Sequence, residues 1–246
     1  MVRFVIPAYD EVENVPALMA DLAPRARRLG AQVIVVDDGS TDGTAEAVAA
    51  HRDGLEIAFV CHERNRGMGG ALDSGLRAAL MDAAADDPIV TLEADNTCDL
   101  KDLPEMLARF ERGFDVVLAS VHTPGGAIVG VERWRSLASR AVSDVFRLVG
   151  GLSEVHTLSS LYRVYRAGML RRVQAGDGVL VREPGFAANV ELLLKLHQAG
   201  ARVCEIPTVN DWRNRQGRSK LRLGPTAAAY LRLMATQIVG RHQPRA

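Results

Sequence analysis

The chain has 246 residues, 48% of them hydrophobic and 24% charged, which excludes a disordered chain and fits one large α/β domain or two small ones. Its thirty basic and thirty acidic residues balance, so no overall charge points to nucleic acid. The cysteines, Cys61, Cys98 and Cys204, are too far apart in sequence for a zinc knuckle or a disulfide framework, which favours a reducing cytosol.

The first half alternates between two kinds of segment. Apolar, strand-like runs occupy residues 2–6, 32–36, 55–61, 88–92 and 115–119. Helical patterns lie between them, at residues 14–29, 43–50, 68–84 and 103–112. This rhythm predicts a mostly parallel, Rossmann-like central sheet with helices on both faces.

The rhythm changes after residue 120. We expect a loop at 121–131, a helix at 132–148, a strand at 159–165, a helix at 184–199, a strand at 203–207 and a helix at 225–239. The intervening loop, 211–222, is basic. We interpret residues 1–246 as a single domain with two halves, 1–120 and 121–246.

Two adjacent carboxylates, Asp37 and Asp38, follow the second apolar run directly. Open α/β sheets bind ligands at the carboxyl ends of their strands. Adjacent carboxylates repel each other unless partners use them, and they suit the N–H groups of a base or the hydroxyls of a ribose. They predict a nucleotide site, although either residue could instead cap the helix that begins near Gly43.

The end of the first strand carries Pro7, Tyr9 and Glu11. Tyrosine offers a flat face for a nucleobase or ribose, and the carboxylate can accept hydrogen bonds from either. The alternative is an ordinary polar turn between a strand and a helix.

Glu93 and Asp95 follow the fourth apolar run. Carboxylates at positions i and i+2 of an extended chain share a side and can hold one divalent cation between them. Such an ion could also bind a diphosphate and offset the charge of a leaving group. The alternative is a solvated strand end.

Three further features suit anions. Gly67 stands at a glycine-rich helix start, where anions are favoured, although close packing is the other interpretation. Arg135 and Ser139 are four apart and so face one way on a helix. The basic loop, with Arg213, Arg215, Ser219 and Lys220, suits a segment that closes over phosphate, or is simply a solvated loop.

Together these segments resemble the family 2 glycosyltransferases of the GT-A fold, and among them the polyprenyl-phosphate sugar transferases of the dolichol-phosphate mannose synthase type. The resemblance rests on six segments. Residues 6–11, I-P-A-Y-D-E, are similar to the family's I-P-x-Y-N-E, with Asp10 in place of the usual Asn, and residues 162–166, Y-R-V-Y-R, are similar to its F-R-x-Y-R. The other four match V-V-D-D-G-S-x-D at 35–42, N-x-G-x-G-x-A at 65–71, E-x-P at 205–207 and G-x-S-K-L at 217–221.

The resemblance implies an inverting transfer from a nucleotide diphosphate sugar, GDP-mannose or a UDP-hexose, to a polyprenyl phosphate. Residues 1–120 would bind the nucleotide sugar and residues 121–246 the acceptor. Tyr9, Glu11 and Asp38 would hold the nucleoside, and Glu93 and Asp95 would bind Mg²⁺ or Mn²⁺, with Asp95 also catalytic. The remaining expected substrate-binding residues are Pro7, Asp37, Gly67, Arg135, Ser139, Arg213, Arg215, Ser219 and Lys220. A cytoplasmic location follows, with peripheral contact at the inner face of the membrane.

The chain departs from this family pattern mainly on the acceptor side. Glu93 replaces the first Asp of D-x-D, Val121 stands where an arginine is usual, and His156 stands where the family has an acid. A hydroxyl acceptor needs a base and a phosphate largely does not, so His156 is a candidate catalytic base or a structural hydrogen-bonding group.

Three alternatives stay open. They are a transferase acting on a soluble small-molecule hydroxyl, a nucleotidyltransferase, and a catalytically impaired nucleotide-sugar-binding protein. The apolar helix 225–239 could lie on a bilayer, in a subunit interface or against the core.

Overall fold

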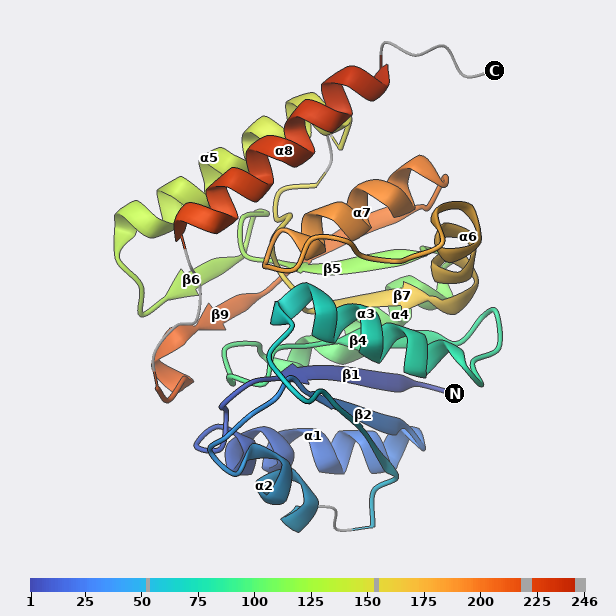
Figure 1. Cartoon of the computed structure of the whole chain (residues 1–246), viewed down its shortest axis with the longest axis vertical. Helices are drawn as coiled ribbons and strands as arrows, with labels where there is room; N and C mark the ends of the chain where they lie inside the picture. Colours follow the sequence, from blue (N-terminus) through green and yellow to red (C-terminus); the bar gives the residue numbers. More distant parts are fainter. Residues whose placement is uncertain (52–53, 153–154, 218–222, 242–246) are drawn as a thin grey trace.

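The computed structural model describes residues 1–51, 54–152, 155–217 and 223–241, and its centre is a twisted β-sheet (Figure 1). Within these residues the sheet has seven strands in the order β3-β2-β1-β4-β7-β5-β8. The strands are β1 (Arg3–Ala8), β2 (Gln32–Asp37), β3 (Ile57–Cys61), β4 (Pro88–Thr91), β5 (Val116–Ser120), β7 (Arg163–Arg166) and β8 (Val203–Pro207). Only β7 runs antiparallel to its neighbours, β4 and β5. A second, two-stranded parallel sheet pairs β6 (Ala127–Val129) with β9 (Val209–Asp211).

Helices cover both faces of the large sheet. They are α1 (Val15–Leu29), α2 (Thr44–Ala50), α3 (Gly67–Leu80), α4 (Leu103–Glu111), α5 (Arg133–Gly150), α6 (Ala167–Asp177), α7 (Ala188–Gln198) and α8 (Leu223–Arg241). Since successive side chains of a strand point to opposite faces, neighbours in β1 enter different cores. Val5 packs with Leu72 of α3, whereas Phe4 packs with Leu22 of α1. The predicted mostly parallel sheet with helices on both faces is confirmed.

Three expectations for the second half were wrong in detail. Residues 121–131, expected as a loop, contain β6, because β6 pairs with β9 about eighty residues later. The strand expected at 159–165 begins only at Arg163, and the helix expected at 184–199 begins at Ala188. Helix α6 was not predicted. In these segments, contacts with distant parts of the chain outweigh the local pattern.

Helices α5 and α8 lie side by side above the rest of the molecule (Figure 1). Ala229 and Leu233 of α8 are buried against the core, so of the three alternatives for this helix, packing against the core is observed for these two side chains. Trp134, Leu137 and Leu231 of the same pair are 56%, 67% and 67% exposed. Among the described residues, no helix combines the length and the apolar character needed to cross a bilayer.

Candidate active site

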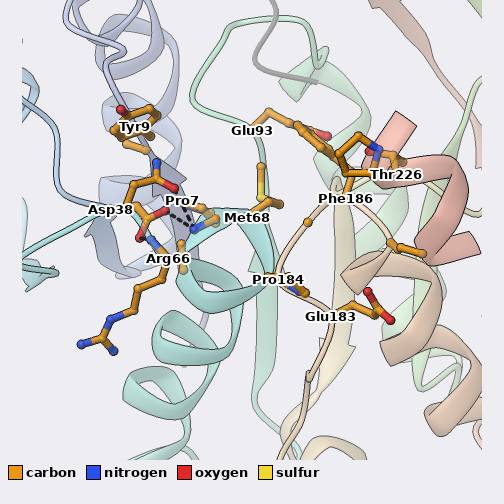
Figure 2. A pocket seen from close by; sticks show the side chains of 18 of the residues that line it. Pro7, Tyr9, Asp38, Arg66, Met68, Glu93, Glu183, Pro184, Phe186 and Thr226 are labelled. Atoms are coloured by element: carbon orange, nitrogen blue, oxygen red, sulfur yellow. Dashed lines mark hydrogen bonds between the residues drawn. The ribbon is translucent and has the colours of Figure 1, made fainter. Parts of the chain in front are cut away.

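A cavity of about 740 Å³ opens at the carboxyl ends of β1 and β4, and Figure 2 shows its walls. Tyr9 and Asp38 lie on one side of it, and Phe186 and Thr226 on the other. The cavity brings together eight of the site residues expected from the sequence: Pro7, Tyr9, Glu11, Asp38, Gly67, Glu93, Asp95 and Arg215. Residues 183–187 and the first turns of α8 close it from the second half.

The two adjacent carboxylates at the end of β2 have different surroundings. Asp38 lines the cavity, and only 2% of its surface is exposed. Its carboxylate accepts hydrogen bonds from the amides of Arg66 and Gly67, both at 2.8 Å (Figure 2). His62 Nδ1 lies 2.6 Å from the same carboxylate. Asp37 does not line the cavity, and its carboxylate accepts the amide of Ser40 at 3.0 Å. Asp38 therefore fastens β2 to the start of α3, and Asp37 caps the turn.

The glycine-rich start of α3 packs closely against the opposite loop. A Cβ atom on Gly67 would lie 2.3 Å from the carbonyl oxygen of Pro184, and one on Gly69 would lie 1.8 Å from that of Glu183. The amide of Gly69 donates to Pro184 at 2.9 Å. These glycines allow two loops to touch, which is the close-packing interpretation of the motif.

Glu11 lies where the first strand meets the basic loop. Its carboxylate accepts from Asn14 Nδ2 at 2.6 Å, and its amide donates to Thr44 Oγ1 at 2.8 Å. Asn14 also donates to the carbonyl oxygen of Gln216 and accepts its amide, at 3.2 and 2.8 Å. The middle of the basic loop is thereby fastened to the start of α1, beside the cavity.

Glu93 is held in place by two donors. Its carboxylate accepts the amide of Leu161 at 3.0 Å and the thiol of Cys98 at 2.8 Å. Burial and the nearby charge of Asp95 raise the pKa of Glu93. Burial and the charge of Glu93 raise the pKa of the Cys98 thiol well above its usual range, so the thiol stays protonated and can donate.

Asp95 faces a cation from the basic loop. Its Oδ1 accepts the hydroxyl of Thr97 at 2.8 Å, and its Oδ2 accepts Nη1 of Arg215 at 2.8 Å. Another nitrogen of Arg215 is 3.9 Å from Glu11. A guanidinium therefore lies between two carboxylates of the cavity.

The chemistry of these groups fits a divalent cation. Glu93 and Asp95 offer hard oxygen ligands. Both oxygens of Glu93 and Oδ2 of Asp95 each accept one hydrogen bond and keep a further lone pair, whereas Oδ1 of Asp95 accepts both the amide and the hydroxyl of Thr97. No group of three or more His, Cys, Asp or Glu side chains that could hold a metal occurs in the described part of the chain. The protein would thus supply part of a coordination shell and leave positions for a diphosphate, and Arg215 would have to yield Oδ2 of Asp95 to the ion.

A separate polar cluster, which we call the His156 cluster, comprises His122, Ser139, His156, Thr157 and Glu205. His156 Nδ1 is 2.9 Å from Glu205 Oε2, and His122 Nε2 is 3.3 Å from Ser139 Oγ. None of the five lines the cavity. Ser139 and His156, both expected from the sequence, are therefore together but apart from the first-half carboxylates.

Of the other expected residues, Arg213 lies outside both sites. Arg213 pairs with Asp211 at 2.6 Å on the surface. Arg135 lies in α5, but its side chain is not among those described, and Ser219 and Lys220 lie outside the described residues.

Sequence reasoning missed Glu183 and Phe186 in the cavity, Asn14 beside it and the partner role of Glu205 in the cluster. The E-x-P motif marked Glu205 without a role. Asn14 lay in a predicted helix start and carried no chemical signal of its own.

Comparison with known proteins places these features in a family. The model of "Glycosyl transferase family 2" matches residues 4–173. An undecaprenyl-phosphate mannosyltransferase from Micrococcus luteus is 30% identical over 204 residues, which is 82% of this chain and 80% of the relative. A polyprenol monophosphomannose synthase from Mycolicibacterium smegmatis is 27% identical over 209 residues, 82% and 74% of the two chains.

Among solved structures, glucosyl-3-phosphoglycerate synthase from Mycobacterium tuberculosis, crystallised with Mn²⁺, UDP and phosphoglyceric acid, superposes with a TM-score of 0.70. The match covers all of this chain and 80% of that one, at 19% identity, and shows a shared fold. The predicted GT-A fold and the predicted family are both confirmed, and the chain belongs to glycosyl transferase family 2.

Proposed function

We propose that the chain transfers a hexosyl group, with inversion, from a nucleotide diphosphate sugar to a polyprenyl phosphate. The observation that carries this proposal is the cavity that places Tyr9, Glu11, Glu93 and Asp95 on common walls. An aromatic face and a carboxylate suit a nucleoside, and a carboxylate pair suits a cation that binds a diphosphate. The donor class is a GDP-mannose or UDP-hexose type of nucleotide sugar.

The acceptor class is supported by what the relatives are called and by the exposed surface of α5 and α8. Both sequence relatives named above are transferases of sugars to polyprenyl phosphates. Trp134, Leu137 and Leu231 expose apolar area on neighbouring helices, which suits contact with the interfacial region of a bilayer. The cytoplasmic face of the membrane is the proposed place of action.

In this mechanism Tyr9 packs on the base, and Glu11 accepts hydrogen bonds from the ribose. Glu93 and Asp95 would hold Mg²⁺ or Mn²⁺, which when bound offsets the negative charge that develops on the departing diphosphate. Arg215, released from Asp95, would turn its guanidinium to the diphosphate oxygens. The acceptor oxygen then attacks the anomeric carbon from the face opposite the diphosphate, which inverts the configuration.

Two measurements test this proposal together. A thermal-shift panel of GDP- and UDP-sugars, with and without Mn²⁺, identifies the donor, because a ligand at about 100 times its Kd stabilises the protein by about 2.7 kcal/mol. Radiolabelled transfer to undecaprenyl phosphate, followed by extraction into organic solvent, identifies the acceptor. No metal-dependent stabilisation by any nucleotide sugar would contradict the donor assignment.

A second candidate is transfer to the hydroxyl of a soluble small molecule, favoured by the His156–Glu205 pair. A hydroxyl must lose its proton to attack, and an imidazole beside a carboxylate is suited to take it. This candidate predicts that labelled product stays in the aqueous phase. Donor binding without any transfer would instead indicate a catalytically impaired binding protein.

A further inference from the structure

Glu205 holds His156 and its loop through three hydrogen bonds. Its Oε1 accepts the amides of His156 and Thr157, both at 2.8 Å, and its Oε2 lies 2.9 Å from His156 Nδ1. The carboxylate side chain is 4% exposed, and the imidazole is 32% exposed. Because a carboxylate only accepts hydrogen bonds, Nδ1 carries the proton of the neutral ring and Nε2 keeps a lone pair.

Three other ionisable groups, His122, Arg140 and Asp144, belong to the same surroundings. His122 follows β5, and Arg140 and Asp144 lie on α5. Burial and the charge of Arg140 lower the pKa of His122, against the opposing charges of Asp144 and Glu205. The lowered pKa favours the neutral form of His122, so this ring adds little charge beside His156.

The loop from His156 to Leu161 joins the cluster to the first-half carboxylates. At one end Glu205 receives the amides of residues 156 and 157, and at the other the amide of Leu161 donates to Glu93 at 3.0 Å. Between them, the fully buried Arg163 donates to the carbonyl oxygen of Leu158. The loop is therefore a fixed bridge between the two sites.

The strand register gives the approximate distance between the two sites that this loop joins. Glu205 pairs with Leu118, Leu118 with Arg163, and Arg163 with Thr91, which lies two residues before Glu93. Three strand spacings of about 4.8 Å separate β8 from β4, roughly 14 Å in all.

Resting on the proposed function, we propose that His156, positioned by Glu205, takes the proton of the acceptor phosphate so that the acceptor attacks as a dianion. The proton of the phosphate monoanion moves to Nε2, and the imidazolium stays beside the dianion. A phosphate oxygen then bonds to the anomeric carbon, while the bond from that carbon to the diphosphate breaks and its electron pair leaves with the nucleotide diphosphate. His156 afterwards returns the proton to solvent.

This assignment has a signature in the pH dependence. A phosphate monoester has its second pKa at about 6, so at pH 5 only about a tenth of a free acceptor is the dianion. An imidazolium that pairs with the dianion keeps this form populated in the complex at lower pH. Loss of His156 should therefore matter in acid and little in alkali.

The test compares kcat/KM for undecaprenyl phosphate from pH 5 to 8.5 in the wild type, His156→Gln and Glu205→Gln. We expect His156→Gln to lose about tenfold at pH 5 and almost nothing at pH 8.5, since the substrate is then already the dianion. Glu205→Gln should shift the profile in the same direction, because its amide can donate to Nδ1 and leave a proton on Nε2. His197→Gln, at the C-terminal end of α7, is the matched control and should follow the wild type.

The possible outcomes distinguish a failure of this inference from a failure of the proposed function. A loss by the same factor at every pH would show that Glu205 and His156 only hold the loop, and it would overturn the inference while leaving the proposed function intact. If Glu205→Gln fails to fold, His156→Gln still tests the inference, because the His156 side chain is partly exposed. A wild type that binds the nucleotide sugar but labels no polyprenyl phosphate would overturn the proposed acceptor, and the inference with it.

Discussion

The donor cavity and the His156 cluster hold their charged side chains in different ways. In the cavity, Glu93 and Asp95 directly follow β4, so the end of one strand delivers both carboxylates. In the cluster, His156 depends on Glu205, which is 49 residues later and reaches it only because β8 pairs with β5. The two carboxylates of the first site thus come from one local segment, whereas the central pair of the second requires the pairing of distant strands.

This difference predicts which substrate a substitution in each region should affect. A substitution in the cavity should affect the donor and the cation while the acceptor site keeps its shape. A substitution in the cluster should affect the acceptor through the loop that ends at Leu161 and Glu93. The variants below separate the two regions, starting with the largest expected effect.

Asp95→Asn should lower kcat/KM by about 10²–10³, because it removes charge that acts on the developing transition state. It should also weaken Mn²⁺-dependent binding of the nucleotide sugar in calorimetry. Asp99→Asn is the control, since Asp99 caps the short 3-10 turn at Leu100–Asp102 and does not line the cavity. Unchanged turnover in Asp95→Asn would exclude the proposed cation site.

Gly69→Ala should destabilise the protein by about 1–3 kcal/mol, because the new methyl group would overlap the carbonyl oxygen of Glu183. Gly176→Ala in α6 is the matched control. Nothing lies within 4 Å of its added Cβ, and it should stabilise by about 0.5–1 kcal/mol. Urea unfolding measures both changes, and equal effects would contradict the close packing of α3 on residues 183–184.

The double variant Trp134→Ser, Leu137→Ser should bind anionic phospholipid vesicles about tenfold more weakly, because two apolar side chains would no longer enter the interface. Turnover with a short-chain, water-soluble acceptor phosphate should stay at the wild-type level. Met81→Ser, 79% exposed at the end of α3, should not change vesicle co-sedimentation. Wild-type vesicle binding by the double variant would exclude α5 as the membrane contact.

Asp42→Asn should have the smallest effect, about 0.5 kcal/mol, because the residue is exposed and screened. Burial tends to raise the pKa of Asp42, but hydrogen bonds from the Thr44 hydroxyl and the amides of Val12 and Thr44 prevail and lower it. A lowered pKa in the folded state means that the stabilisation is complete above about pH 5 and declines as the pH falls below about 4. Urea unfolding of wild type and variant from pH 6 to 3 should show their difference shrinking in acid, and a constant difference would contradict this.

The carboxylates and the tyrosine of the cavity could be predicted because their signals are short-range. Tyr9 and Glu93 each follow an apolar strand, and a parallel sheet brings such strand ends to one edge. The sequence could not show that Asp37 and Asp38 have different roles, because these roles depend on which backbone amides donate to each carboxylate. The pairing of Glu205 with His156 required knowing that β8 lies beside β5.

The antiparallel strand β7 also governs when β4 and β5 can be joined in one sheet during synthesis. β4 and β5 follow one another along the chain, yet β7 lies between them in the sheet. Until residues up to Arg166 have left the ribosome, the edge of β4 that faces β7 lacks its native partner, and such open edges invite wrong pairing. A nascent chain stopped after β5 would therefore present an unpaired β4 edge, and release of that edge from chaperones should coincide with the emergence of β7.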